Sequence, residues 1–316
     1  MVVGSRSLNP VISVIIPHLN QPDSLEACLH SLEAQTLERS KFEVIVVDNG
    51  SSRGPETQIS RHRGVRLLRE SEPGPGPARN CGAKAATGDI LCFIDADCRA
   101  HPEWLDIVHS KLNSLPQGTI LGGDVQIWRD NKKHFTAIEA YESVFGYRQK
   151  MHVERFGFSG SGNLAVRRTD FEKVGPFKGI TLAEDLDWGN RAQVAGFRFV
   201  YVPQMIVYHP ARASLRHLCI QWDRLIQHTL TTARQRSRWK IYWVLRAIAV
   251  FGSSFAHIPE VMTSRHINGL ATRIKAFSVL VMIRSYRAWR MMTLLRGPDP
   301  GVVWNRDAAV GAVKPE

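Results

Sequence analysis

Short runs of apolar, mostly β-branched residues recur along the first hundred residues of the chain. They cover residues 11–16, 42–47, 65–68 and 90–94. Runs that are apolar at nearly every position are typical of strands buried on both faces, as in a parallel sheet. The first run ends at Pro17, and we expect it to be a central strand.

The segments between these runs carry apolar residues at helical spacing. One begins at Asp23 and another spans residues 102–115. Residues 78–86 are also good helix formers, whereas the loop 73–77 holds three prolines and is expected to lie outside the helix, which would put Arg79 in the first turn. Strands that alternate with helices predict an α/β layer fold.

Two carboxylates, Asp95 and Asp97, follow the last of these strands. Residues two apart on a strand share a face, so both side chains can point at one cation. Ligands bind beyond the carboxyl ends of parallel strands, and carboxylates there suit Mg²⁺ or Mn²⁺ holding a phosphorylated substrate. A solvated turn at the end of a strand uses Asp in the same way, so the motif alone leaves both interpretations open.

Two later segments also contain residues suited to chemistry. Residues 157–163 include three glycines, which permit close approach of the backbone to a ligand but also occur in flexible loops. Residues 182–188 contain three acids at an expected helix start. Acids favour the first turn of any helix, and Asp187 is spaced to pair with Arg191, so a purely structural role is the alternative.

The basic charge of the protein is confined to its C-terminal part. The chain of 316 residues carries a net charge of +12, yet residues 212–296 alone hold 15 Lys or Arg against Asp223 and Glu260. We therefore expect a catalytic domain over residues 1–211 and a basic helical module over residues 212–316. No nucleic-acid-binding module accompanies the basic residues, so nucleic acid is not an expected partner.

The C-terminal module mixes aromatic residues and arginines along expected helices. Helices with an apolar face and an Arg-rich polar face lie in membrane interfaces, where anionic lipid contributes ~1 kcal/mol per basic residue. We expect peripheral attachment to an anionic membrane. The alternative is a soluble helical subdomain packed on the core or across a homodimer. The aromatic residues include Trp239, Tyr242, Trp243, Phe251 and Phe255.

The chain has five cysteines and no Cys-x-x-Cys pair, a pattern that indicates a protein of the reducing cytosol. Residues 1–10 lack the apolar segment of a signal peptide. The longest charge-free stretch of the basic module, residues 247–259, is shorter than the ~20 residues of a membrane span. We therefore expect a cytoplasmic protein, peripheral at the inner face of the cell membrane, with no transmembrane helix.

Several motifs occur together and in order between residues 11 and 209, and by them the chain resembles the inverting family 2 glycosyltransferases, which have a GT-A fold. The motifs are Pro17-His18-Leu19-Asn20, Val46-Val47-Asp48-Asn49-Gly50-Ser51, Gly76-Pro77-Ala78-Arg79-Asn80, Phe93-Ile94-Asp95-Ala96-Asp97, Gly160-Ser161-Gly162-Asn163, Glu184-Asp185 and His209. The resemblance implies a nucleotide-sugar-binding, mostly parallel sheet flanked by helices.

The resemblance also implies roles for individual residues. Asp48 would accept a hydrogen bond from the imide N–H of uracil, with Arg79 in the same pocket, and Asp95 would bind the ribose or the sugar. The donor is expected to be a UDP-sugar. The residues implied in binding it are Pro17, Asn20, Asp48, Arg79, Asp95, Gly162, Asn163 and Glu184.

The implied chemistry is inverting transfer assisted by Mn²⁺ or Mg²⁺. Asp97 would bind the metal that stabilises the leaving diphosphate, and His209 is either a further ligand or an ordinary core or surface histidine. Asp185 would be the general base that takes the proton of the acceptor hydroxyl. We expect neighbouring Glu184 and Asp187 to raise its pKa.

Two departures from the family pattern are informative. Asn49 stands where the family usually has a second acid, and the Gln-x-x-Arg-Trp signature of processive synthases is only partly echoed by Gln221-Trp222-Asp223-Arg224. We therefore expect transfer of one sugar per encounter, to a lipid-linked saccharide or a cell-surface glycan. The alternative is a catalytically silent scaffold or partner subunit, against which the retained acids argue. No Gly-x-Gly-x-x-Gly follows the first strand, which disfavours a dinucleotide-dependent oxidoreductase.

Overall fold

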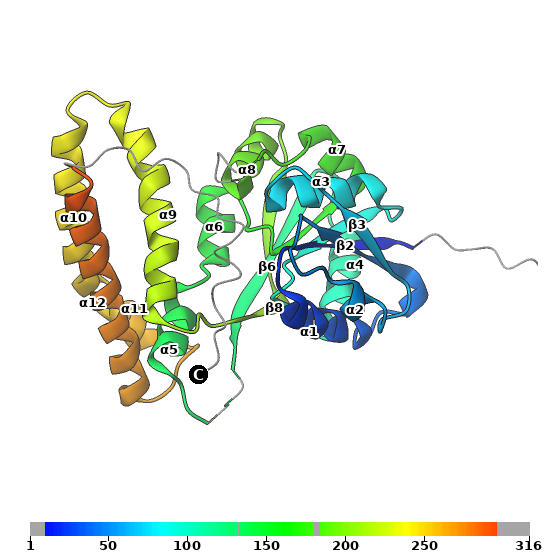
Figure 1. Ribbon diagram of the computed structural model, residues 1–316, viewed down its shortest axis with the longest axis horizontal. Helices are drawn as coiled ribbons and strands as arrows, with labels where there is room; N and C mark the ends of the chain where they lie inside the picture. Colours follow the sequence, from blue (N-terminus) through cyan, green and yellow to red (C-terminus); the bar gives the residue numbers. More distant parts are fainter. Residues whose placement is uncertain (1–9, 130, 132, 180–183, 296–316) are drawn as a thin grey trace, which may run out of the picture. The chain divides into compact units, whose positions relative to one another are not determined.

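The computed structural model describes residues 10–129, 131, 133–179 and 184–295. These residues form two compact units. The first comprises the described residues up to 126 together with 148–209, and the second comprises those of 127–147 together with the described residues from 210 onward. The strands belong to one eight-stranded sheet with the order β3-β2-β1-β4-β7-β6-β8-β5 (Figure 1).

One half of the sheet is parallel, as its apolar runs predict. The strands are β1 (Ile12–His18), β2 (Phe42–Asp48), β3 (Val65–Arg69) and β4 (Ile90–Ile94). β1 is central in this half and pairs in parallel with both β2 and β4. Asp48 is therefore the last residue of β2, opposite His18 at the end of β1.

The other half contains antiparallel pairs. β7 (Asn163–Arg167) runs antiparallel to both β4 and β6 (Thr119–Trp128), and β5 (Arg99–Ala100) runs antiparallel to β8 (Arg198–Pro210). The result is a mixed, mostly parallel α/β sheet, and with the C-terminal helices it confirms the expected GT-A fold class. The antiparallel β7 directs its first residue, Asn163, toward the end of β4 that precedes Asp95.

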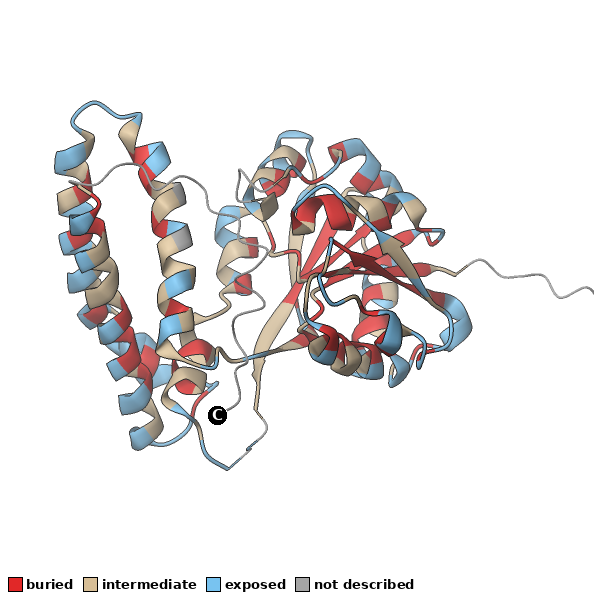
Figure 2. Cartoon of the chain, in the orientation of Figure 1, coloured by how far each residue is buried: buried red, intermediate tan, exposed pale blue. Residues whose placement is uncertain are grey.

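Helices cover both faces of the sheet, because successive buried strand residues face opposite sides. Ile12, Val14 and Ile16 pack with α1 (Pro22–Glu33) and α4 (Trp104–Ser114). Ile15 packs on the other face with residues of α3 (Pro75–Ala85), α7 (Arg168–Val174) and α8 (Glu184–Val194). Figure 2 shows the resulting buried centre of the sheet. The remaining short elements of this unit are η1 (Arg39–Lys41), α2 (Glu56–Ile59) and α6 (Gln149–Phe156).

The start of α3 differs from the sequence prediction. The helix begins at Pro75 instead of after Pro77, so Arg79 lies beyond its first turn. Proline is tolerated in a first helical turn, because the N–H that it lacks has no partner there in any case. Gly74, with φ of 126°, precedes the helix in a conformation that favours glycine.

The second unit is helical. It contains α5 (Ala137–Phe145), α9 (Leu215–Arg234), α10 (Trp239–Ala256), α11 (Ile258–Thr263) and α12 (Leu270–Thr293). Trp243 of α10 is fully buried, and its indole N–H donates to the carbonyl oxygen of Met291 on α12 at 2.8 Å. Residues 127–147 group with these helices, although the sequence placed them in the first domain.

One segment of the helical unit corrects an expectation. The stretch Trp239–Thr263 is long and apolar enough, by length and composition alone, to cross a membrane. The expectation that no segment meets this criterion was wrong, because it counted only the charge-free residues 247–259, whereas a span tolerates a few charges.

Candidate active site

Asp48 is held at the end of β2 by a buried histidine. His18 Nδ1 lies 3.1 Å from Asp48 Oδ1, and the backbone N–H of Gln21 donates to His18 Nε2 at 3.2 Å. Burial lowers the pKa of His18, although its bond to Asp48 opposes the shift. The neutral imidazole therefore donates from Nδ1 and accepts at Nε2. The sequence prediction did not assign a role to His18, which here orients the expected nucleotide-binding carboxylate.

Asn20 connects the loops that follow β1 and β2. Its φ of 54° is left-handed, a conformation that Asn adopts more readily than most residues. Its side-chain oxygen accepts hydrogen bonds from the backbone N–H groups of Ser52, at 2.8 Å, and Arg53, at 3.3 Å. Pro17, three residues before Asn20, is the penultimate residue of β1. Asn20 thus ties the loop after β1 to the loop after β2.

The contacts of Asn49 show why an amide stands where the family usually has a second acid. Its side-chain amide donates to the carbonyl oxygens of Glu70, at 3.1 Å, and Glu72, at 2.7 Å, while its oxygen accepts from the backbone N–H of Gly74 at 2.7 Å. A carboxylate has no N–H to donate and would face two carbonyl oxygens. Asn49 is therefore required here to anchor the loop that leads into α3.

Arg79 joins the two acidic motifs of the chain. The guanidinium is buried, and it donates to Asp95 Oδ1 at 2.7 Å and to Glu184 Oε1. The other Glu184 oxygen accepts from the backbone N–H of Gly76 at 3.0 Å. A Cβ at Gly76 would come within 2.6 Å of the Lys178 carbonyl oxygen, so the glycine permits this approach. Residues that are about 90 positions apart in the chain thus converge on one cation.

The pKa values of Arg79 and Glu184 each depend on the charges of neighbouring side chains. Burial alone would lower the pKa of Arg79, but the carboxylates of Asp95 and Glu184 outweigh burial and raise it, so the guanidinium stays charged. Burial raises the pKa of Glu184; Arg79 opposes this shift, and Asp185 adds to it. The arginine therefore keeps closely placed acids compatible with a buried site.

Asp185 has a buried acceptor atom that is not used within the protein. Its Oδ1 atom is buried without a hydrogen-bond partner. Burial raises the pKa of Asp185; the Arg79 charge and hydrogen bonds from Ser161 lower it, and Asp95 raises it. A raised pKa brings a carboxylate closer to the range in which it exchanges a proton efficiently. The sequence predicted that Glu184 and Asp187 raise this pKa, but the acid that raises it is Asp95, which lies far away in sequence.

Asp187 has the structural role that its position suggests. Its carboxylate pairs with Arg191 at 2.9 Å and with Lys178 at 3.0 Å. These two partners lower the pKa of Asp187, outweighing the effect of burial. The two acids of α8 therefore differ: Asp187 is paired with basic side chains, whereas Asp185 has an oxygen without a partner.

Asp97 and His209, the residues predicted to hold a metal, lie close together. Asp97 follows β4, His209 lies near the end of β8, and Asp97 Oδ2 is 3.2 Å from His209 Nε2. Their ligand atoms and the Cys98 sulfur lie within 4.8 Å of one another. Burial, reinforced by Asp97 and Asp95, keeps the pKa of the Cys98 thiol well above its ordinary value. A carboxylate and an imidazole fit a divalent ion such as Mn²⁺.

Asp95 and Asp97 do not act as a simple pair on one strand face. β4 ends at Ile94, and the backbone N–H of Cys98 donates to the Asp95 carbonyl oxygen at 3.0 Å, which closes a turn. One carboxylate therefore faces Arg79, while the other faces His209. The side chain of Asp95 is 37% exposed, which leaves it accessible to a ligand hydroxyl.

Gly162 and Asn163 contribute to the site through contacts within the protein. A Cβ at Gly162 would lie 2.5 Å from Asp95 Oδ2, so the glycine makes room for this carboxylate. Asn163 is fully buried, and its amide donates to the carbonyl oxygens of Asp124, at 2.7 Å, and Met205, at 2.8 Å. Its oxygen accepts from the Trp104 indole N–H at 2.9 Å. The contacts of Asn163 are thus internal.

The fold and this arrangement of acids define a GT-A-type, nucleotide-sugar-dependent glycosyltransferase. The family model described as "Glycosyl transferase family 2" matches residues 13–175. The chain therefore belongs to glycosyltransferase family 2 and is an enzyme of that class.

Relatives with known names are similar to this chain over about two thirds of its length. Glycosyltransferase AglE of Haloferax volcanii is 34% identical over 210 residues, which cover 64% of this chain and 68% of AglE. The amylovoran biosynthesis glycosyltransferase AmsB of Erwinia amylovora is 28% identical over 213 residues, which cover 62% of this chain and 69% of AmsB.

Solved structures share the fold at low sequence identity. A mannosyltransferase of Pyrobaculum calidifontis, in complex with GDP-Man and Mn²⁺, superposes with a TM-score of 0.57 and 18% identity, over 92% of this chain and 89% of that one. S. aureus TarS 1-349, in complex with UDP-GlcNAc, gives a TM-score of 0.51 and 16% identity, over 89% and 92% of the two chains.

Proposed function

We propose that this enzyme transfers one sugar per encounter, with inversion, from a UDP-sugar to a hydroxyl of a lipid-linked saccharide or cell-surface glycan. The observation that carries the proposal is the Arg79 bridge, which brings Asp95 and Glu184 together and places Asp185 beside them. This cluster supports a donor site with the base beside it.

The nucleobase contact rests on Asp48. His18 fixes one oxygen of this carboxylate, and the backbone N–H of Ser51 contacts the other at 3.3 Å. An oriented carboxylate accepts a hydrogen bond from an imide N–H, such as that of uracil. Guanine also presents a ring N–H, and this makes GDP-sugars the competing donor class.

Asp97 and His209 would hold Mn²⁺ or Mg²⁺ at the donor diphosphate. When bound, the metal supplies positive charge that stabilises the leaving nucleoside diphosphate. Asp95, held in place by Arg79, is positioned to accept a hydrogen bond from a ribose or sugar hydroxyl. The protein therefore provides separate groups for the diphosphate and for the sugar.

Asp185 serves as the general base. Its unpartnered Oδ1 takes the proton of the acceptor hydroxyl while the hydroxyl oxygen attacks the anomeric carbon and the bond to the diphosphate breaks. Attack opposite the leaving group inverts the anomeric configuration. Arg79 stabilises the ionised form of Asp185 before the proton arrives.

The helical unit supports the proposed acceptor class. α10 exposes a stripe of apolar side chains at helical spacing, and this stripe supports peripheral attachment to an anionic membrane on the cytoplasmic side. A membrane-bound enzyme meets lipid-linked acceptors directly. The stripe consists of Ile241, Leu245, Ile248, Phe251 and Phe255, which are 48% to 63% exposed.

Release of nucleoside diphosphate from UDP-, GDP- and dTDP-sugars, with Mn²⁺ or with EDTA, tests the donor assignment. We expect metal-dependent release from a UDP-sugar, strongly reduced in Asp97→Ala. Asp89→Ala, which changes an exposed acid at the start of β4, is the matched control and should retain activity. Turnover of only GDP-sugars would contradict the UDP assignment. Failure of every nucleotide to bind would favour a silent scaffold.

A further inference from the structure

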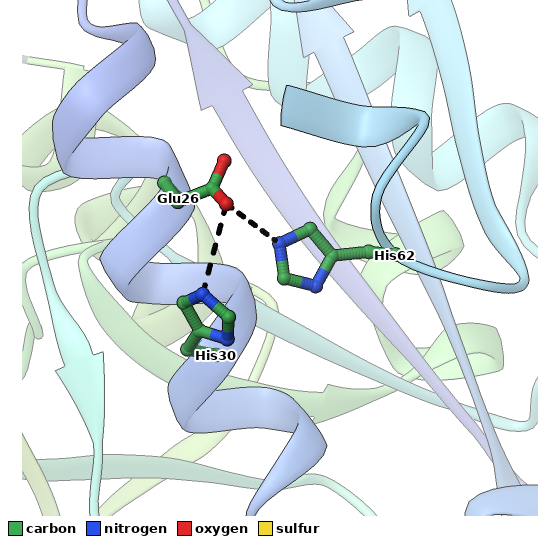
Figure 3. A group of neighbouring side chains, drawn as sticks. All are labelled: Glu26, His30 and His62. Carbon is green, nitrogen blue, oxygen red and sulfur yellow. Dashed lines mark ion pairs between the residues drawn. The ribbon is translucent and has the colours of Figure 1, made fainter. Parts of the chain in front are cut away.

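A second group of potential metal ligands lies between α1 and the segment after α2. Glu26 and His30 are four residues apart on α1 and share a face, and His62 follows α2 (Figure 3). The Glu26 Oε1 atom is 3.6 Å from His30 Nε2 and 3.7 Å from His62 Nε2. The three ligand atoms lie within 4.8 Å of one another.

These separations match metal ligation better than hydrogen bonding. A hydrogen bond to an imidazole requires about 3.2 Å or less between heavy atoms. Zn²⁺ holds nitrogen and oxygen ligands at ~2.1 Å, so two ligands of a tetrahedral ion lie roughly 3.4 Å apart. Both measured separations are close to that value. In Figure 3 the imidazole rings of His30 and His62 each turn a nitrogen toward the carboxylate.

Two buried polar atoms of the group have no hydrogen-bond partner. They are Glu26 Oε2 and His62 Nε2, and the His62 side chain is only 2% exposed. An unpaired buried acceptor is costly, which makes each such atom in a native structure a candidate for an ion or a ligand. Both atoms belong to the same small cluster.

Glu33 orients the imidazoles in the manner of a metal site. Its Oε1 is 2.7 Å from His62 Nδ1, and its Oε2 is 3.4 Å from His30 Nδ1. The close contact assigns the proton to Nδ1 of His62 and leaves an electron pair on Nε2, which faces Glu26. Carboxylates behind the distal nitrogen of a ligating histidine recur in metalloproteins and raise its basicity.

We propose that Glu26, His30 and His62 bind one divalent transition-metal ion, best Zn²⁺, with water completing its coordination. Two imidazoles and a carboxylate are a ligand set that Zn²⁺ accepts. The ion would link the segment after α2 to α1. This site is separate from the Asp97–His209 pair. Arg61, which is 62% exposed on its side chain, contacts Glu26 Oε1 at 3.4 Å and competes with the ion for this oxygen.

Zn²⁺ titration of the full chain against a chromophoric chelator tests the site. The Asp97→Ala background removes a ligand of the other candidate site, and in it we expect one Zn²⁺ per chain. Adding His30→Ala, at a side chain that is 64% exposed and therefore tolerant of change, should weaken binding at least tenfold. Glu33→Gln should weaken it about 10- to 100-fold.

The matched control is His109→Ala on α4, which should leave Zn²⁺ affinity unchanged. Co²⁺ bound to the same background should show the visible absorption of a tetrahedral site, absent in His30→Ala. Zn²⁺ should also raise Tm in the Asp97→Ala chain and leave it unchanged once His30 is replaced. Equal affinity in His30→Ala and His109→Ala, or no binding in the Asp97→Ala background, would overturn the proposal.

Discussion

At the residue scale, the residues of the site can be predicted from the sequence, but most of the contacts between them cannot. Asp48, Arg79, Asp95 and Asp185 stand in recognisable motifs, so their order along the chain predicts them. The partner of Arg79 and the source of the Asp185 pKa shift depend on contacts between distant segments. Such contacts have no local sequence signal. His18 is the exception, because it lies inside a motif and could have been considered with Asp48.

Asn49 illustrates why a departure from a family pattern requires the structure. The sequence shows only that an amide replaces an acid. The reason is the presence of two carbonyl oxygens, of Glu70 and Glu72, that approach the side chain from a segment some twenty residues later. The amide of Asn49 anchors the loop that leads into α3.

Ser161 is one of the groups that lower the pKa of the proposed base. Its hydrogen bonds lower the pKa of Asp185, against a rise caused by burial. The base must be ionised, so kcat/KM should fall as pH decreases through this pKa. Ser161→Ala removes the side-chain bond and should move the acidic limb to higher pH, with little effect well above it. A pH profile of kcat/KM for both proteins checks this, and an unmoved limb would argue against Asp185 as the titrating group.

At the scale of elements, strand runs are read from the sequence more reliably than the start of a helix. The four apolar runs correspond to β1 to β4. β1, β2 and β4 are buried along nearly their whole length, whereas β3 is half-buried to exposed. The start of α3 was predicted too late, since prolines that exclude a helix interior are acceptable in its first turn. Arg79 is therefore further along the helix than expected.

The side chain of Asn163 connects β7 to neighbouring elements. The resemblance placed it among donor-binding residues, but its polar atoms contact Trp104, Asp124 and Met205. This internal role depends on three distant elements, and the motif alone gives no sign of it.

Asn163→Ala should therefore act on stability. Buried partners that lose a hydrogen bond cost about 1–3 kcal/mol each, so we expect the free energy of unfolding to fall by about 3 kcal/mol. Asn113→Ala, at an exposed position of α4, should change it by no more than ~0.5 kcal/mol. Denaturant unfolding measures both. Unchanged stability together with weakened donor binding would restore the donor-contact role.

At the scale of the whole molecule, the charge pattern predicted a C-terminal helical module but gave no sign of a segment inserted from earlier in the chain. Residues 127–147 group with the C-terminal helices through α5. Within this unit the carboxylate of Glu142, whose side chain is fully buried, pairs with Arg212. Neither the charge nor the length of this segment indicates that it belongs to the helical unit, so only the three-dimensional contacts place it there. The domain division after residue 211 remains a prediction.

Membrane attachment is the prediction that belongs to this scale. The apolar stripe on α10 and the net positive charge of residues 212–296 should bring the protein to vesicles that contain anionic lipid. Leu245→Glu with Ile248→Glu should abolish co-flotation with such vesicles. Val194→Glu, at an apolar α8 residue that is 91% exposed, is the control and should still bind.

The outcomes separate the alternatives for the helical unit. Release by high salt would indicate binding at the surface, whereas resistance to carbonate would indicate that the stretch Trp239–Thr263 crosses the bilayer. Absence of vesicle binding, with a dimer in solution that the double substitution dissociates, would replace the membrane with a second copy of the chain.

The most direct test of the central claim compares Asp185→Asn with Asp187→Asn in a transfer assay that also measures donor binding. The two acids lie on one turn of α8, but Asp185 has an unpartnered buried oxygen, whereas Asp187 pairs with two cations. We predict that Asp185→Asn lowers kcat roughly 10²- to 10⁴-fold and keeps donor affinity. Asp187→Asn should transfer sugar at nearly the wild-type rate. Comparable transfer rates in the two variants would contradict the assignment of Asp185 as the base.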